Sequence, residues 1–127
     1  MCKVNMLGYP INVDYGAHVK QRLRSRFDDM DIAYLEYRIE EVFSDEAVAD
    51  HLMNEVKMGE DVILIDEDSG ITFAVNVGTD TLYIMTVYNA FEYSGFRCGD
   101  RQQVLKYAEK SGFRSGRFER KRGNVYA

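Results

Sequence analysis

The sequence has little of several residues on which common protein classes depend. Its 127 residues include one proline, two cysteines and no tryptophan. Cys2 and Cys98 stand far apart and form no C-x-x-C pair, so neither a disulfide framework nor a zinc ribbon is expected. No run of about 18 apolar residues occurs, and the first residues do not resemble a signal peptide. We therefore expect a cytoplasmic protein with no membrane partner.

Motifs that bind nucleotides or metals are also missing. Neither glycine-rich phosphate pattern, G-x-G-x-x-G or G-x-x-x-x-G-K-[ST], occurs. His51 has Asp50 and Glu55 nearby, but no second histidine or cysteine pair completes a metal-binding set. The acidic residues from Asp66 to Asp68 lack the spacing of a calcium loop. The sequence thus predicts no cofactor and no metal site.

A single domain is the natural interpretation of a chain of this length in which 46% of residues are hydrophobic, since it can bury a core without disulfides. No linker and no internal repeat divides it. We expect the domain to span residues 1–112. Residues 113–127 form a basic tail, expected to be mobile unless it binds something. The tail's candidate nucleic-acid-binding residues are Arg114, Arg117, Arg120, Lys121 and Arg122.

Charge is strongly segregated along the chain, although the net charge is only −5. Residues 1–27 carry five basic residues and one acidic residue, and residues 97–127 carry nine and three. Residues 28–68 carry two basic and fifteen acidic residues. If the two basic ends meet in space, they present a basic surface to nucleic acid. The alternative is that each charged run is a solvated face.

The stretch from Asp61 to Asn89 is typical of a three-stranded antiparallel meander. Three runs rich in Val, Ile, Phe, Tyr and Thr are separated by turn-type clusters at residues 66–70 and 78–80. In the middle run, every second residue from Ile71 to Val77 is large and apolar. One face of this strand therefore needs a hydrophobic cover, which helices must supply.

Helical patterns precede the meander. A short extended or irregular segment, residues 1–13, leads into a helix over residues 15–27 with Asp14 as its N-cap. A second amphipathic helix covers roughly residues 32–43. A third runs from about residue 44 to about residue 58, with acids at its positive end.

A last helix follows the meander, from a cap at Asp100 to about residue 112. The expected fold is therefore α+β. Its N-terminal helices pack on one face of a three- or four-stranded antiparallel sheet, and a C-terminal helix follows.

The first helix carries the pattern that points most directly to chemistry. Beside its apolar stripe, which includes Val19 and Leu23, His18, Arg22 and Arg26 repeat every fourth residue. Cleaving RNA without a metal needs a base, an acid and cations that stabilise the charge on phosphorus. This stripe supplies much of that set. The structural alternative is a helix with a partly buried histidine and solvated arginines.

The run His18-Val-Lys-Gln-Arg22-Leu-Arg-Ser-Arg26-Phe, with the later strand Leu82-Tyr-Ile-Met-Thr86-Val-Tyr88, resembles small toxin-like domains of the RelE and barnase/EndoU/colicin-type nuclease superfamily. The resemblance implies helices packed on one face of an antiparallel sheet, and metal-independent RNA cleavage by a protein of a mobile element or phage. It implies RNA as one partner and a protein, an antitoxin or a host target, as another.

The resemblance also implies roles for single residues. His18 would be the acid or base, Arg22 a phosphate clamp, and Thr86 and Tyr88 polar groups on the last strand, while Arg26 would contact nucleic acid. The register of the last hairpin decides the orientation of Thr86 and Tyr88. A three-residue loop puts both on the open face, whereas a four-residue loop, which pairs Val77 with the residue after Thr81, reverses this.

Two other functions fit the same sequence. The acidic surface of residues 28–68 is typical of a non-catalytic interaction or inhibitor protein that engages a basic partner. The basic, aromatic tail is typical of a plain nucleic-acid-binding module.

Overall fold

The computed structural model describes residues 2–89, 102–108 and 114–118, which form seven strands and three helices. The elements in chain order are β1 (Cys2–Met6), β2 (Tyr9–Tyr15), α1 (Ala17–Arg26), α2 (Ile32–Phe43), α3 (Glu46–Asn54), β3 (Asp61–Asp66), β4 (Ile71–Val77), β5 (Thr81–Asn89), β6 (Gln102–Tyr107) and β7 (Arg114–Phe118). The strands form one sheet in the order β1-β2-β5-β4-β3-β6-β7. The β2–β5 and β3–β6 pairs are parallel, and the other pairs are antiparallel.

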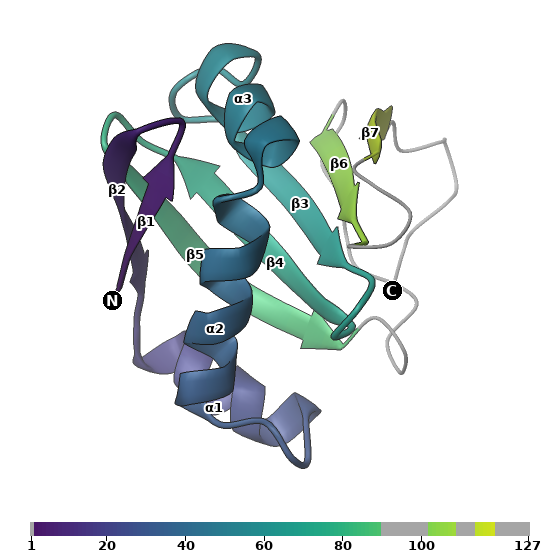
Figure 1. The fold of residues 1–127 in the computed structure, drawn as a ribbon. Helices are drawn as coiled ribbons and strands as arrows, with labels where there is room; N and C mark the ends of the chain where they lie inside the picture. Colours follow the sequence, from purple (N-terminus) through teal and green to yellow (C-terminus); the bar gives the residue numbers. More distant parts are fainter. Residues whose placement is uncertain (1, 90–101, 109–113, 119–127) are drawn as a thin grey trace.

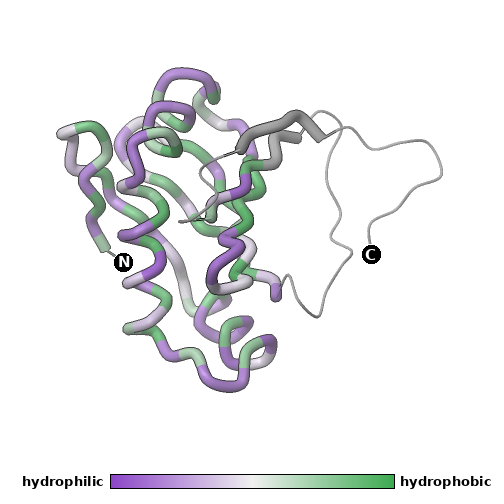
Figure 2. The backbone as a smooth tube through the Cα atoms, turned by 45° about the vertical axis from the view of Figure 1, so that its right-hand side comes forward, coloured by the Kyte–Doolittle hydropathy of each residue, from purple (hydrophilic) through white to green (hydrophobic). Residues whose placement is uncertain are grey.

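Two helices, α2 and α3, lie on one side of the sheet, and α1 closes the lower end of the core (Figure 1). α2 crosses the front of the sheet with α3 above it, while α1 lies at the lower end and packs along β5 (Figure 1). Leu35 and Ile39 of α2 are fully buried, and Phe43 meets Phe73 of β4 edge-to-face at 5.6 Å. Apolar and polar residues alternate along the strands and helices that enclose this core (Figure 2). No helix in the described part of the chain is long and apolar enough to span a membrane.

The predicted fold class is wrong, although its central part is right. β3, β4 and β5 form the expected antiparallel meander. However, strands are added on both sides of it, and two of the added pairings are parallel. Each outer strand of the meander has a free row of N–H and C=O groups, to which β6 pairs along β3 and β2 pairs along the first part of β5.

The first thirteen residues form a β-hairpin where an irregular segment was expected. β1 and β2 pair from Cys2 with Val13 to Met6 with Tyr9, around a two-residue turn. Pro10 is tolerated because β2 pairs with β5 only later, from Asn12 onward, so no partner there requires its missing N–H. The proline therefore excluded a helix, as the sequence suggested, but did not exclude a strand.

The central part of the predicted last helix is a strand. Residues 102–107 form β6, parallel to β3, and the expected cap at Asp100 lies outside the described residues. Leu105 and Tyr107 are buried and the Lys106 between them is exposed, which is the two-residue period of a strand. Over so short a segment the same residues also fit a helix, so the edge of β3 decides the outcome.

Part of the predicted tail belongs to the sheet. Residues 114–118 form β7, which pairs with β6, so the domain continues past residue 112. Residues 119–127, with Arg120, Lys121 and Arg122, lie outside the described residues.

The three helices before the meander are confirmed. α2 begins after Asp31, whose side chain accepts a hydrogen bond from the Tyr34 amide, and α3 begins after Asp45, which caps the Val48 amide. α1 begins after Gly16 and without a side-chain cap. Asp14, the predicted cap, is still part of β2.

A buried ion pair joins α2 to the β3–β4 turn. The Arg38 guanidinium donates to both carboxylate oxygens of Asp66, at 2.7 and 3.0 Å, and Asp66 is fully buried. The Ser69 hydroxyl and the Asp68 amide also donate to this carboxylate. Burial is the largest single effect on the pKa of Arg38 and lowers it, but the hydrogen bonds to Asp66, together with the negative charges of Asp66 and Asp68, raise this pKa overall. The guanidinium therefore stays charged and holds α2 in place.

A second polar contact joins α2 to β2. The Tyr15 hydroxyl donates a short hydrogen bond to the Glu36 carboxylate, and Tyr15 is only 6% exposed. Burial, and then the hydrogen bond and charge of Glu36, raise the pKa of Tyr15 above its ordinary value of 10.0.

Arg38→Met removes the charge but keeps an unbranched side chain. We expect it to lower the free energy of unfolding by about 3–5 kcal/mol, because Asp66 is left buried without its ionic partner. Arg24→Met, on the exposed surface of α1, is the matched control and should change stability by less than about 0.5 kcal/mol. Urea denaturation followed by circular dichroism measures both. Equal small losses would contradict the role of the ion pair.

The Tyr15–Glu36 contact predicts a loss of stability at alkaline pH. Because the folded-state pKa of Tyr15 is raised, its contribution is complete below pH 10.0 and is lost as the pH rises through the folded-state pKa. At about pH 11 the parent should have lost about 1.4 kcal/mol from this residue. Tyr15→Phe should remove this part of the loss. Urea denaturation at pH 8 and at about pH 11 checks it, and an identical loss in Tyr15→Phe would show that other groups cause it.

Candidate nucleic-acid interface on α1

The apolar stripe of α1 fixes which of its side chains reach the surface. Val19 and Leu23 are buried against the sheet, as the four-residue spacing predicts. One residue behind them, His18 is exposed and Arg22 and Arg26 are half-buried. The stripe of His18, Arg22 and Arg26 therefore does flank the core, at its border with solvent.

His18 lies in a shallow surface hollow formed by α1 alone. Its companions there are Ala17, Lys20, Gln21 and Arg24. Arg22, the predicted phosphate clamp, does not line this hollow. The polar side chains that line the hollow with His18 carry a primary ammonium, an amide and a guanidinium, which are all hydrogen-bond donors suited to an anion.

The described part of the chain does not neutralise the cations on the exposed side of α1. Lys20, Arg22 and Arg24 form no ion pair with any residue in the described ranges. This is notable because acidic residues greatly outnumber basic ones in the chain segment that follows α1. Among the described residues, no carboxylate of α2 or α3 pairs with these cations, so the exposed side of α1 keeps its positive charge.

Arg26 has a different role from the other cations of α1. Its Nη1 donates to the Val87 carbonyl at 2.7 Å, and its guanidinium lies 4.7 Å from the centre of the Tyr88 ring. The Arg26 carbonyl in turn accepts a hydrogen bond from the Asn89 side chain at 2.9 Å. Arg26 therefore ties the end of α1 to the end of β5.

Thr86 and Tyr88 lie on the face of the sheet opposite the core, but neither predicted register accounts for this orientation. Val77 pairs with Leu82, the four-residue loop that should turn both residues inward. A β-bulge then adds Met85 opposite the Ala74/Val75 step and reverses the alternation. As a result, Leu82, Ile84 and Val87 are all buried, while Thr86 and Tyr88 are half-buried on the other face.

The four predicted catalytic residues do not gather at one point. Tyr88 meets Arg26 at the C-terminal end of α1. His18 lies eight residues earlier, which is about 12 Å along a helix axis. The structure thus separates the hollow around His18 from the Arg26–Tyr88 contact.

Sequence reasoning missed two features of this region. Lys20 and Arg24 were not singled out, although they are four residues apart and so lie on one face of a helix. The second feature is Thr72, the cross-strand neighbour of Tyr88, whose buried hydroxyl makes no hydrogen bond. No pattern in the sequence marks this hydroxyl.

No group of three or more His, Cys, Asp or Glu side chains within residues 2–89, 102–108 and 114–118 is arranged to hold a metal ion. His51 is buried, and its Nδ1 lies 2.8 Å from the Glu55 carboxylate. Of the predicted tail contacts, Arg114 and Arg117 belong to β7.

Comparison with known proteins identified no relative of the chain. No protein-family model matches the chain, and searches of curated proteins and of solved structures gave no significant match.

Proposed function

We propose that the protein binds RNA through the exposed face of α1, defined by His18, Lys20, Gln21, Arg22 and Arg24. The observation that carries this proposal is that the cations of α1 lack ionic partners among the described residues of an acidic protein. A positive surface attracts a polyanion and gains affinity by releasing its counterions.

The kinds of side chain in the hollow favour phosphate over a single carboxylate. The Arg24 guanidinium can donate two parallel hydrogen bonds, and the Lys20 ammonium adds a compact charge. The Gln21 amide donates without charge. Contacts of this kind bind the backbone rather than the bases, so we expect little sequence preference.

Cleavage of the bound RNA is the further step implied by the resemblance to metal-independent nucleases. His18 would take the proton of a 2′-hydroxyl or deliver one to the leaving oxygen, since histidine changes charge near neutral pH. Lys20 and Arg24 would stabilise the negative charge that develops on the phosphate. This activity places the protein in the cytoplasm, where RNA substrates are found.

A second candidate function is favoured by the acidic surface of α2 and α3. Glu40, Glu46 and Asp50 are exposed and form no ion pair with any residue that the structure describes. Tyr34 and Tyr37 of α2 are also exposed, and their ring centres lie 6.2 Å apart. Exposed carboxylates attract a basic protein partner, and aromatic rings contact its cationic side chains. If the parent protein does not bind RNA, this surface becomes the leading candidate.

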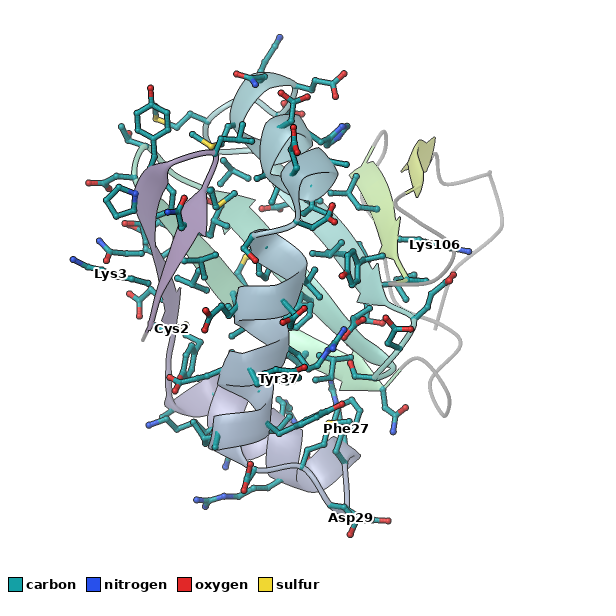
Figure 3. The ribbon with its side chains drawn as sticks, viewed as in Figure 1. Cys2, Lys3, Phe27, Asp29, Tyr37 and Lys106 are labelled. Atoms are coloured by element: carbon teal, nitrogen blue, oxygen red, sulfur yellow. The ribbon has the colours of Figure 1, made fainter. Side chains whose placement is uncertain are left out.

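The double variant Lys20→Gln/Arg24→Gln should weaken binding to single-stranded RNA and flatten its salt dependence. Each phosphate contact contributes about 0.7 to the slope of log affinity against log salt concentration, so the slope should fall by about 1.4. Fluorescence anisotropy at several salt concentrations measures it. The control, Lys3→Gln/Lys106→Gln, removes the same charge from exposed sites on β1 and β6 (Figure 3). An equal fall in the control would indicate a general charge effect.

His18→Ala should separate cleavage from binding. In buffer containing EDTA, we expect it to slow RNA cleavage by about 10²- to 10⁴-fold, because proton transfer is lost. Its RNA affinity should stay close to that of the parent, since His18 is one of several contacts. Gel analysis of end-labelled RNA measures the rate. Cleavage at the parental rate would contradict a catalytic role for His18.

A further inference from the structure

An apolar pocket of about 250 Å³ opens at the end of the molecule opposite α1. It lies between the β1–β2 hairpin, α3 and the β4–β5 turn, and Met6, Ile11, Leu52 and Leu82 form much of its wall. The one polar side chain in the lining is Thr79, whose hydroxyl donates to the Met58 sulfur at 3.3 Å. The other lining side chains are apolar, so the pocket suits an apolar group.

Exposed apolar side chains surround this pocket. Met53 and Met58, both in its lining, are 37% and 67% exposed. Leu7, the residue after Met6, is 40% exposed at the tip of the β1–β2 hairpin. We call Leu7, Met53, Met58 and the pocket the apical surface. Apolar side chains gathered around an apolar pocket mark a site of association.

Leu7 is also held in an unfavourable conformation. Its φ is 55° and that of Gly8 is 88°, which is the pattern of a type I′ turn. Such turns favour Asn, Asp or Gly at the first central position, because a branched side chain is strained at positive φ. The hairpin thus keeps a residue that opposes its own turn and whose side chain points to solvent. Strain of this kind is a reason to look for a function.

We propose that two copies of the chain form a two-fold dimer through the apical surface, with Leu7 of each copy inserted into the pocket of the other. A two-fold interface needs one surface that carries both a projecting group and its receptor. The apical surface has both, because the hairpin that presents Leu7 also lines the pocket through Met6 and Ile11. A leucine side chain is apolar and fits a cavity of this volume.

The apolar contact made by the inserted Leu7 distinguishes this dimer from association driven by charge. The apolar side chains of Met53 and Met58 would cover the inserted leucine, and flexible methionines adapt well to such a contact. An apolar interface keeps or gains affinity as salt rises. Association between the basic face of α1 and the acidic face of α2 would instead weaken with salt.

Sedimentation equilibrium of the full chain tests the proposal, over loading concentrations from roughly 1 to 100 μM at low and high salt. The parent should dimerise, and no less tightly at high salt. Leu7→Asn should weaken the dimer at least about tenfold. At a concentration where the parent and the variant are both monomeric, the variant should unfold at an equal or higher temperature, because Asn accepts positive φ.

Two further variants complete the test. Val56→Phe, which fills the pocket from the segment that follows α3, should also give monomers with native circular dichroism. Met85→Ser, which removes an exposed apolar side chain from the bulge of β5, is the control and should dimerise like the parent. A monomeric parent over the whole range, a dimer that dissociates with salt, or unchanged dimerisation of Leu7→Asn would each overturn the proposal.

Discussion

The ion pair between Arg38 and Asp66 is the interaction on which the layering of the fold depends. A charge pair removed from water is stable only when its hydrogen bonds are complete, and here the guanidinium, the Ser69 hydroxyl and the Asp68 amide satisfy the carboxylate. Because the pair has one acceptable geometry, it sets where α2 crosses the sheet. Apolar contacts such as that of Ile39 tolerate small shifts and would specify this position less sharply.

Features of the fold that depend on neighbouring residues could be predicted from the sequence. The spacing of Val19 and Leu23 and the amphipathic pattern of α2 are local, and both helices are found where they were predicted. Strand pairing between distant segments is not local. The β1–β2 turn carries Leu7 where an asparagine would have signalled a hairpin. Leu105 lies in a segment that fits a helix or a strand until the edge of β3 is known.

The candidate site was predictable to the same extent. The exposure of His18 follows from helix periodicity, and so does the position of Arg24 one turn after Lys20, which was not predicted as a contact. The orientation of Thr86 depends on the bulge at Met85. The sequence held an indication of this bulge, because Ile84 and Val87 are three residues apart and cannot both face the core of a regular strand. Only the pairing with β4 shows where the extra residue is placed.

The positions of the α1 face and the apical surface connect the two proposals. α1 lies at one end of the molecule, and the β1–β2 turn and α3 lie at the other (Figure 1). A dimer formed through the apical surface therefore leaves both α1 faces uncovered and far apart. Two weak phosphate-binding faces on one particle bind a long RNA with an avidity that neither has alone, provided that the strand spans the distance between them. Dimerisation would then raise affinity for long RNA while leaving affinity for short oligonucleotides unchanged.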